Sequence, residues 1–189
     1  MQAALTIVDL EDPLNQGCIN LITILVPPGS ILNPSNEAAV CAGNVLTSQR
    51  LVDVVFKAFS TTAASHTTAA SQGCMNNLTF GINGTDGFGY YETICGGSGG
   101  GPTWQGSSGV HTNMTNTRIN APESLERQYP VVLRQFVLRP DSGGDGAHPG
   151  GDGVIRDIES RIPMTVSILS ERRTFGLMAW LVGSQASVD

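Results

Sequence analysis

The sequence predicts an α+β fold, with a mixed or mainly antiparallel sheet, few helices and long glycine-rich loops. Only one long segment, residues 44–59, has apolar residues at a helical period, whereas several short segments carry the β-branched and aromatic residues typical of strands. Glycine and proline are frequent, with 23 and 10 copies, and charged residues make up only 14% of the 189 residues. This composition suits a loop-rich fold better than a helical bundle.

The first half of the chain predicts one strand and one helix. Residues Ile19–Val26 form an apolar, strand-like run that ends at the Pro-Pro-Gly sequence of residues 27–29. The helix is expected over Asn44–Phe59, because its apolar residues fall roughly on one side and Asn44, Thr47 or Ser48 can cap it.

The second half predicts a short helix and three strands. The helix is expected from Asn120 to Pro130, with an asparagine-led cap at its start. Strands are expected at Val131–Arg139 and Val154–Glu159, separated by a glycine-rich turn. The segment Met164–Leu169 can pair beside the second of these strands.

The stretch Gly87–Arg118 concentrates most of the polar chemistry. It predicts two short strands, at Tyr90–Ile94 and Val110–Thr115, joined by a loop over residues 96–102 in which six of the seven residues are glycine or proline. Such a loop can bring backbone amides close to a ligand. The alternative is a mobile surface loop. The sequence contains neither a Walker A motif nor a dinucleotide-binding fingerprint.

Glu92, His111 and Arg118 are the ionisable residues of this stretch. If its two strands converge on one cavity, Glu92 and His111 are candidate proton-transfer residues, and Arg118 can pair with a carboxylate or phosphoryl group. The alternatives are a surface carboxylate, a lone histidine and a structural salt bridge. No second histidine or carboxylate stands at ligand spacing, so the sequence assigns no metal ligands.

Amide and hydroxyl side chains gather at the ends of several predicted elements. Such groups can hold a small amide or acid substrate, or they can satisfy backbone groups at element ends. The candidate substrate-binding residues are Asn44, Ser48, Gln49, Gln72, Asn76, Tyr91, Gly97, Gly99, Thr117 and Arg118.

Composition and charge argue against several classes of function. The formal net charge is -6 and no basic cluster exceeds Arg172-Arg173, so nucleic acid is not expected as a partner. The longest apolar run, residues 19–28, falls short of the roughly 20 residues that span a bilayer, and no signal peptide opens the chain. The four cysteines lack CxxC spacing, which predicts reduced, mostly buried thiols. We therefore expect a soluble cytoplasmic protein.

Six motifs follow one another along the chain: GNVLTSQRLVDVVFKAF, AASQGCMNN, GYYETICGGSGGGP, GVHTNMTNTR, ERQYPVVLR and GGDGVIRDIE. Together they resemble the hydantoinase B half of the ATP-dependent 5-oxoprolinases, in its eukaryotic form. The resemblance runs from Pro13 to Arg173. It implies that the chain is part of a larger hydantoinase B-type domain.

The resemblance also implies an activity, in which ATP drives the opening of the lactam of 5-oxo-L-proline to give L-glutamate, ADP and phosphate in glutathione turnover. ATP would be bound by a hydantoinase A-like ATPase half that phosphorylates the cyclic amide, as in the related N-methylhydantoinases and acetone carboxylases. The B half would receive the activated species, often with a divalent metal. We expect the parent enzyme to be a homo-oligomer, with Glu92 and His111 as its candidate catalytic residues in this region.

The chain departs from the family pattern in three places. It carries no ATP-binding half, it begins downstream of the family's histidine and aspartate metal motif, and it diverges after Arg173. We therefore expect a partial hydantoinase B domain over residues 1–173, a divergent tail over 174–189, metal ligands outside this chain, and a fragment that is inactive alone. The alternatives are a hydantoinase B-type subunit acting on other cyclic amides, and a non-catalytic truncated module that only binds a hydantoinase A-type partner.

Overall fold

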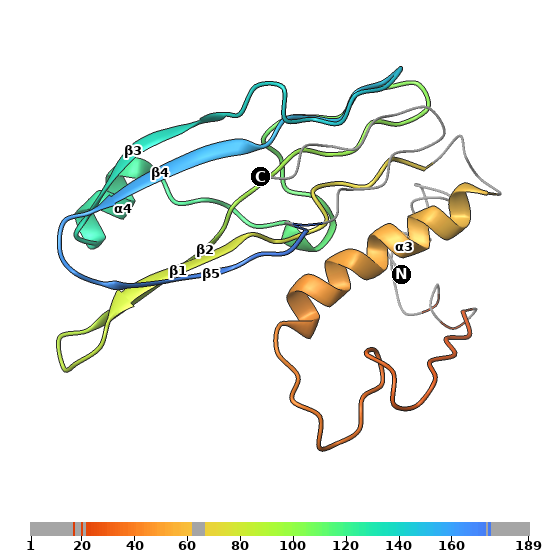
Figure 1. The fold of residues 1–189 in the computed structure, drawn as a ribbon, viewed down its shortest axis with the longest axis horizontal. Helices are drawn as coiled ribbons and strands as arrows, with labels where there is room; N and C mark the ends of the chain where they lie inside the picture. Colours follow the sequence, from red (N-terminus) through yellow and green to blue (C-terminus); the bar gives the residue numbers. More distant parts are fainter. Residues whose placement is uncertain (1–16, 18–19, 21, 62–66, 173, 175–189) are drawn as a thin grey trace.

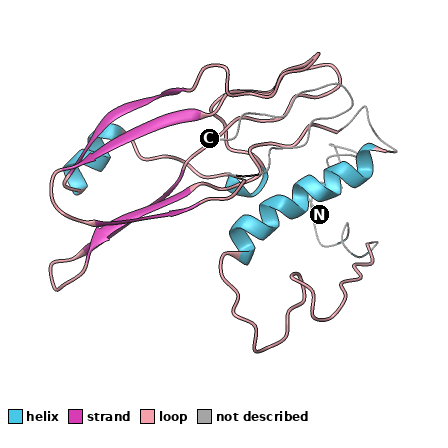
Figure 2. Cartoon of the chain, viewed as in Figure 1, coloured by secondary structure: helices cyan, strands magenta, loops and turns pink. Residues whose placement is uncertain are grey.

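The computed structural model describes residues 17, 20, 22–61, 67–172 and 174. In these residues the chain forms, in order, a short π-helical segment η1 (Gly43–Thr47), α3 (Ser48–Ser60), β1 (Asn77–Ile82), β2 (Phe88–Thr93), a 3₁₀ turn η3 (Asn113–Thr115), α4 (Pro122–Gln128), β3 (Val131–Leu138), β4 (Val154–Ser160) and β5 (Thr165–Leu169). These strands all pair antiparallel, so the predicted α+β class is confirmed (Figure 2).

The helix predicted at Asn44–Phe59 is confirmed as η1 followed by α3, which lies beside the strands in Figure 1. Its start differs from the expectation, because Ala42 occupies the N-cap with a left-handed φ of 56° and no side chain caps the first turn. The Ser48 hydroxyl instead donates to the backbone carbonyl of Asn44, at 2.7 Å. Gln49 is the buried residue of α3, and it faces the loops that follow.

Three strands form one sheet in the order β2-β1-β5. β1 lies in the middle, with Leu78 opposite Glu92 of β2 and Ile168 of β5. The expectation that residues 164–169 pair beside β4 is wrong. Just after β4, the Arg161 amide still donates to the Pro130 carbonyl beside the start of β3, at 2.9 Å. The chain then crosses to the other sheet, where β5 pairs with the edge of β1 that β2 leaves free.

The other sheet is the antiparallel pair of β3 and β4, with an irregularity between Leu133 and Gln135. It confirms the strands predicted at 131–139 and 154–159. The short helix before β3 is also confirmed as α4, although its N-cap is Ala121 and no side chain caps it. Proline at the first position of α4 costs nothing there, because that amide would have no partner in the helix.

The core lies where the two sheets and α4 meet. Its buried residues are Phe80 of β1, Tyr90 of β2, Leu125 of α4 and Val131 of β3. Tyr129 packs edge-on against Tyr90, with ring centroids 4.9 Å apart, and so closes the α4 end of the core. In Figure 1 the two sheets lie opposite each other with α4 at one end.

Two predicted strands are wrong. In the segment Val110–Thr115, Val110 makes one isolated bridge to Gly96 and residues 113–115 turn into η3. The side chains of Thr112 and Thr115 bond reciprocally to backbone groups across η3, so local side-chain bonds replace a strand ladder.

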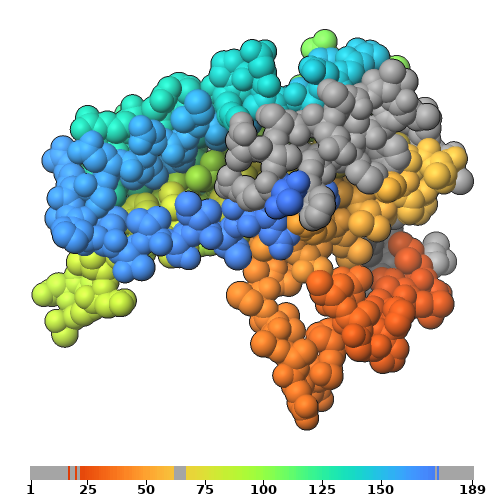
Figure 3. Space-filling view, viewed as in Figure 1, coloured from red at the N-terminus to blue at the C-terminus, as the bar shows by residue number. Residues whose placement is uncertain are grey.

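The strand predicted at Ile19–Val26 lies partly outside the described residues, and its described residues from 22 to 26 are not in a strand. No strand of the described part pairs with them, and an unpaired strand leaves its backbone groups without partners. Leu25 is 87% exposed. Residues 22–42, red to orange in Figure 3, project away from the strands. No helix in the described part is both long and apolar enough to cross a membrane.

Candidate functional site

A pocket of about 270 Å³ lies between α3, the segment that precedes β1 and the loops that follow β2. Its walls combine hydroxyl, amide and aromatic side chains with one carboxylate. The lining residues are Asp53 and Phe56 of α3, Thr68, Ala69 and Ser71 of the segment before β1, Ser98, Gly99 and Trp104 of the glycine-rich loop region, and Thr112 and Asn113 at η3.

Asp53 is the charged residue of this wall. Its Oδ2 is buried and has no hydrogen-bond partner among the described residues. Burial raises the pKa of Asp53 to about 6, against the opposing effects of Arg172, of a hydrogen bond from the Ser71 backbone and of Arg50. The side chain can therefore exchange a proton near neutral pH.

Gln49 joins three parts of the pocket. It is completely buried, one turn before Asp53 on the same face of α3. Its Nε2 approaches the hydroxyls of Ser71 and Thr112, at 3.3 and 3.5 Å, and its Oε1 accepts a 2.9 Å hydrogen bond from the Met114 amide. The predicted candidate Gln49 therefore lies behind two wall residues, where it fixes their positions.

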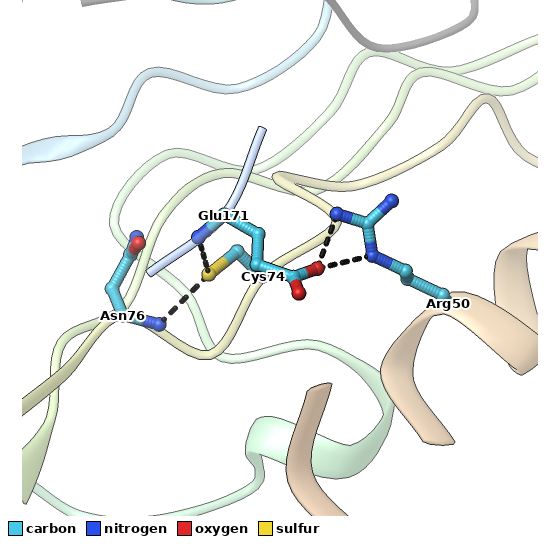
Figure 4. A network of polar contacts seen from close by, with 4 residues as sticks. All are labelled: Arg50, Cys74, Asn76 and Glu171. Carbon is cyan, nitrogen blue, oxygen red and sulfur yellow. Dashed lines mark hydrogen bonds and ion pairs between the residues drawn. The ribbon is translucent and has the colours of Figure 1, made fainter. Parts of the chain in front are cut away.

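A polar network joins α3 to the segment after β5 and to the turn before β1 (Figure 4). Arg50 forms an ion pair with Glu171, and its Nε donates to Glu171 Oε2 at 2.6 Å. The buried Cys74 sulfur accepts hydrogen bonds from the amides of Glu171 and Asn76, at 3.0 and 3.3 Å. These bonds hold the segment after β5 against α3, and so bring Arg172 within electrostatic reach of Asp53.

The structure brings two further candidates, Gln72 and Asn76, together in this region. Asn76 Nδ2 donates to Gln72 Oε1 at 3.2 Å, and Gln72 Nε2 donates to the Cys74 carbonyl at 2.6 Å. Both amides are thus engaged inside the turn that leads into β1. Neither residue lines the pocket of Asp53.

Glu92 lies in a different environment, between the two sheets. Its carboxylate forms a two-point ion pair with Arg156 of β4, in which Nε donates to Oε1 at 2.6 Å and Nη2 donates to Oε2 at 2.9 Å. The Tyr90 hydroxyl adds a third bond, to Oε2 at 2.6 Å. Burial, together with this bond to Glu92, raises the pKa of Tyr90. The Arg156 and Glu92 side chains are only 1% and 3% exposed, so the group is enclosed by protein.

His111 is half-buried, and its Nδ1 has no hydrogen-bond partner among the described residues. Burial lowers its pKa, which favours the neutral imidazole. The antiparallel bridge between Gly96 and Val110 places the backbone of His111 opposite that of Cys95. Cys95 follows Glu92 by three residues in the sequence. In the described part no hydrogen bond or ion pair joins Glu92 and His111.

The remaining candidate residues lie on the surface or in loops. The Tyr91 hydroxyl donates to Asn77 Oδ1 at 2.7 Å, while 56% of the Tyr91 residue is exposed. Asn44, Thr117 and Arg118 are exposed, and none of them lines the Asp53 pocket. The assignment of all these residues to substrate binding stays a prediction.

The glycine-rich loop packs tightly against other backbone segments. A side chain at Gly97 would overlap the carbonyl of Gly151, and one at Gly99 would overlap that of Ala69. The Ser98 amide donates to the Ser107 carbonyl, at 3.0 Å, so the loop is bonded into the fold. Glycine is required here for close backbone approach, and Gly99 also lines the pocket.

Sequence reasoning missed Asp53, Ser98, Trp104 and Thr112 as pocket residues. Asp53 could have been found from helical spacing, because it lies four residues after Gln49 and both polar residues share the side of α3 that turns inward. The loop residues gave no comparable signal, since their meeting depends on long-range backbone packing.

The described residues contain neither a cluster of metal-binding side chains nor a thiol that is both buried in the pocket and reactive. Among the residues that the structure describes, no group of three or more His, Cys, Asp or Glu side chains could hold a metal ion. Cys74 and Cys95 are buried free thiols and Cys41 is an exposed one, whereas Cys18 lies outside the described residues. Burial raises the pKa of the Cys95 thiol, which disfavours the reactive thiolate.

The fold and the pocket define an α+β protein with a small pocket whose lining includes one carboxylate, that of Asp53. The chain belongs to the family Hydantoinase B/oxoprolinase, which matches residues 1–187. It is similar to 5-oxoprolinase 1 of Arabidopsis thaliana, with 59% identity over 88% of this chain and 12% of that protein. It is also similar to 5-oxoprolinase of Dictyostelium discoideum, with 55% identity over 89% of this chain and 13% of that protein.

The fold is similar to that of a nucleotide-free acetone carboxylase structure, with a TM-score of 0.51 and 18% sequence identity. The likeness covers 67% of this chain and 16% of the carboxylase chain. It supports the fold assignment alone. The chain thus spans only about an eighth of the length of the 5-oxoprolinases it matches, as the 12% and 13% coverages show.

Proposed function

We propose that this chain is a segment of the hydantoinase B domain of an ATP-dependent 5-oxoprolinase, which converts 5-oxo-L-proline, ATP and water into L-glutamate, ADP and phosphate. The observation that carries the proposal is the identity of 59% and 55% with two proteins named 5-oxoprolinase, over nearly the whole chain. Because the chain covers only 12% and 13% of those proteins, we assign the activity to the parent enzyme and a share of its cyclic-amide site to this chain.

ATP is assigned to a hydantoinase A-like ATPase, either fused in the parent chain or bound as a subunit. Neither the glycine-rich loop nor the Asp53 pocket favours a nucleotide phosphate chain. In the glycine-rich loop the amides of Ser98 and Gly101 donate to the carbonyls of Ser107 and Trp104, so they are not directed at an anion. None of the pocket residues is a lysine or arginine. The proposal places the parent in glutathione turnover in the cytoplasm, as a homo-oligomer, with any divalent metal bound outside this chain.

His111 remains the better of the two predicted proton-transfer residues. Its unpartnered Nδ1 and lowered pKa suit a neutral base. Glu92 is held by Arg156 and Tyr90, and these bonds would have to break before its carboxylate could accept a proton from a substrate. This geometry favours a structural role for Glu92.

The test compares the chain alone with the chain mixed with a separately purified hydantoinase A-type ATPase. ADP and ring-opened product are measured with 5-oxo-L-proline and with hydantoin. We expect no turnover by the chain alone, complex formation with the ATPase, and glutamate release by the intact parent enzyme. Turnover of hydantoin but not 5-oxo-L-proline by the parent would favour a hydantoinase. A complex whose parent opens neither ring would favour a non-catalytic module.

A further inference from the structure

β5 is an edge strand of the three-stranded sheet in the part of the chain that the structure describes. All five of its residues, Thr165–Leu169, are exposed. The strand contains no charged residue and no proline, and its pairing with β1 is regular, without a bulge. Edge strands that face water usually carry such features, because these prevent pairing with another strand. We therefore expect an element outside the described residues to cover β5.

The side chains of β5 alternate between the two faces of the sheet. Val166 lies opposite Phe80 of β1, which is part of the core. Ile168 lies opposite Leu78, which packs against the same core. Directly opposite residues share a face, so Val166 and Ile168 lie on the core face and Ser167 lies on the other. This alternation of apolar and polar residues is typical of a strand that is buried on one face.

The core face is nevertheless largely uncovered at β5. Val166 and Ile168 are 56% and 65% exposed, whereas Phe80 on the same face is only 3% exposed. The opposite sheet has just two strands in the described part, and its β4 lies over β2, where Arg156 bonds Glu92. In Figure 3 a hollow separates β4 from β5, and yellow-green residues of the three-stranded sheet show in it. Two apolar side chains of the core face thus remain in contact with water.

We propose that the outer edge of β5, which faces away from β1, receives a β-strand from the part of the hydantoinase B domain that lies outside this chain. This inference rests on the proposed function only in taking the chain to be a segment of a larger domain. The chain covers 12% and 13% of the two 5-oxoprolinases, so most of the parent lies outside it.

A strand satisfies both features of this surface. Its backbone pairs with β5, and its apolar side chains on one face cover Val166 and Ile168. A segment of the same domain is favoured over a second copy of the chain, because Val166 and Ile168 extend the core of Phe80 and Leu78 instead of forming a separate patch. The layers of a domain pack around one hydrophobic core.

The test measures hydrogen–deuterium exchange by mass spectrometry, on the chain alone and on the intact parent enzyme. In an antiparallel edge strand, alternate amides point away from the neighbouring strand and exchange fast unless another strand accepts their hydrogen bonds. We expect β5 to exchange at least about tenfold more slowly in the parent than in the chain alone. β1, which is paired on both sides in the chain, is the internal reference. Equal exchange of β5 in the two proteins would overturn the inference.

A pair of lysine substitutions tests which face of β5 is covered. Ile168→Lys puts a charge on the core face and should speed the exchange of β5 in the parent by at least about tenfold. Ser167→Lys is the matched control, because it puts the same charge on the other face of the next residue and should keep exchange slow. Slow exchange of β3 and β4 in both variants shows that the fold is intact. Equal effects of the two lysines would overturn the inference, and the comparison of the wild-type proteins decides it if a variant fails to fold.

Other occupants of the surface give different results. A second copy would make the exchange of β5 in the chain alone depend on protein concentration and reach the parent's rate at high concentration. Residues 175–189 of this chain would slow the exchange at every concentration until they are removed. Either result would overturn the inference. Turnover of 5-oxo-L-proline is measured separately, so a parent that protects β5 but opens no ring would fail the proposed function and leave this inference standing.

Discussion

Glu92 of β2 and Arg156 of β4 form a two-point ion pair that links the two sheets of the fold, with both side chains almost fully enclosed. The guanidinium also lies 5.0 Å from the centre of the Phe136 ring, so a flat cation is held between a carboxylate and an aromatic face. Removing one partner of such a buried ion pair destabilises the fold, because the charge of the other partner then remains in a poorly solvated site without a counter-charge. This geometry favours a structural role for Glu92.

We predict that Glu92→Gln lowers the free energy of unfolding by about 3–5 kcal/mol, since it leaves Arg156 without a counter-charge. Urea denaturation followed by circular dichroism measures the loss. Replacing both residues together, as Glu92→Leu with Arg156→Met, should cost less than the sum of the single changes. A stable Glu92→Gln variant that folds like wild type would contradict this structural role.

The control for this prediction is the exposed pair of Arg134 and Glu159, whose side chains are 57% and 48% exposed. Glu159→Gln makes the same chemical change where water screens both charges, so it should cost less than about 1 kcal/mol. A similar loss in both variants would indicate that burial of the Glu92 pair is not what makes it important.

The sequence predicted the fold well where local patterns decide it. The helical period of α3 and the strand residues of β2, β3 and β4 all predicted the elements that form. Prediction failed where long-range contacts or local side-chain bonds decide the outcome. β5 pairs with β1 because the chain crosses between sheets, and Thr112 with Thr115 stabilises a turn in place of a strand.

The candidate site shows the same division. Gly99 of the predicted glycine-rich loop lines a pocket, whereas the convergence of Glu92 and His111 on one cavity stays a prediction. The carboxylate of that pocket was not predicted, because Asp53 lies about forty residues earlier, in a helix whose candidate residues were the amides and hydroxyl of Asn44, Ser48 and Gln49. The ion pair of Glu92 joins residues 64 positions apart, and no spacing rule connects them.

Gln49 provides a test of how the pocket walls are held. We predict that Gln49→Leu lowers the free energy of unfolding by about 1–3 kcal/mol, because the Met114 amide loses its acceptor in a buried site. Urea denaturation measures the change. Gln128→Leu, at the exposed end of α4, is the control and should stay within about 0.5 kcal/mol of wild type. Equal effects would show that the buried amide does not organise these loops.

Gly97 tests the close packing of the glycine-rich loop. We predict that Gly97→Ala destabilises the chain by more than about 2 kcal/mol, since the new methyl group would overlap the Gly151 carbonyl. Gly89→Ala in β2 meets no atom within 4 Å, so it should change stability by less than about 1 kcal/mol. Thermal melts of the two variants compare them directly. If Gly97→Ala melts like Gly89→Ala, the loop is free to move away from residue 151.

Asp53 should make the stability of the chain depend on pH. Its pKa rises from 3.8 in the unfolded reference to about 6 in the fold, so between these values the folded state keeps a proton that the unfolded state loses. Stability therefore falls as pH rises from about 4 to about 6, by about 3 kcal/mol in all, and stays lower above that range. Asp53→Asn carries no ionisable group and should remove this fall, which makes the variant more stable than wild type near neutral pH. Urea denaturation at a series of pH values measures both curves, with Asp157→Asn expected to follow wild type. Curves for wild type and Asp53→Asn that run parallel across this range would mean that the carboxylate is solvated in the folded chain.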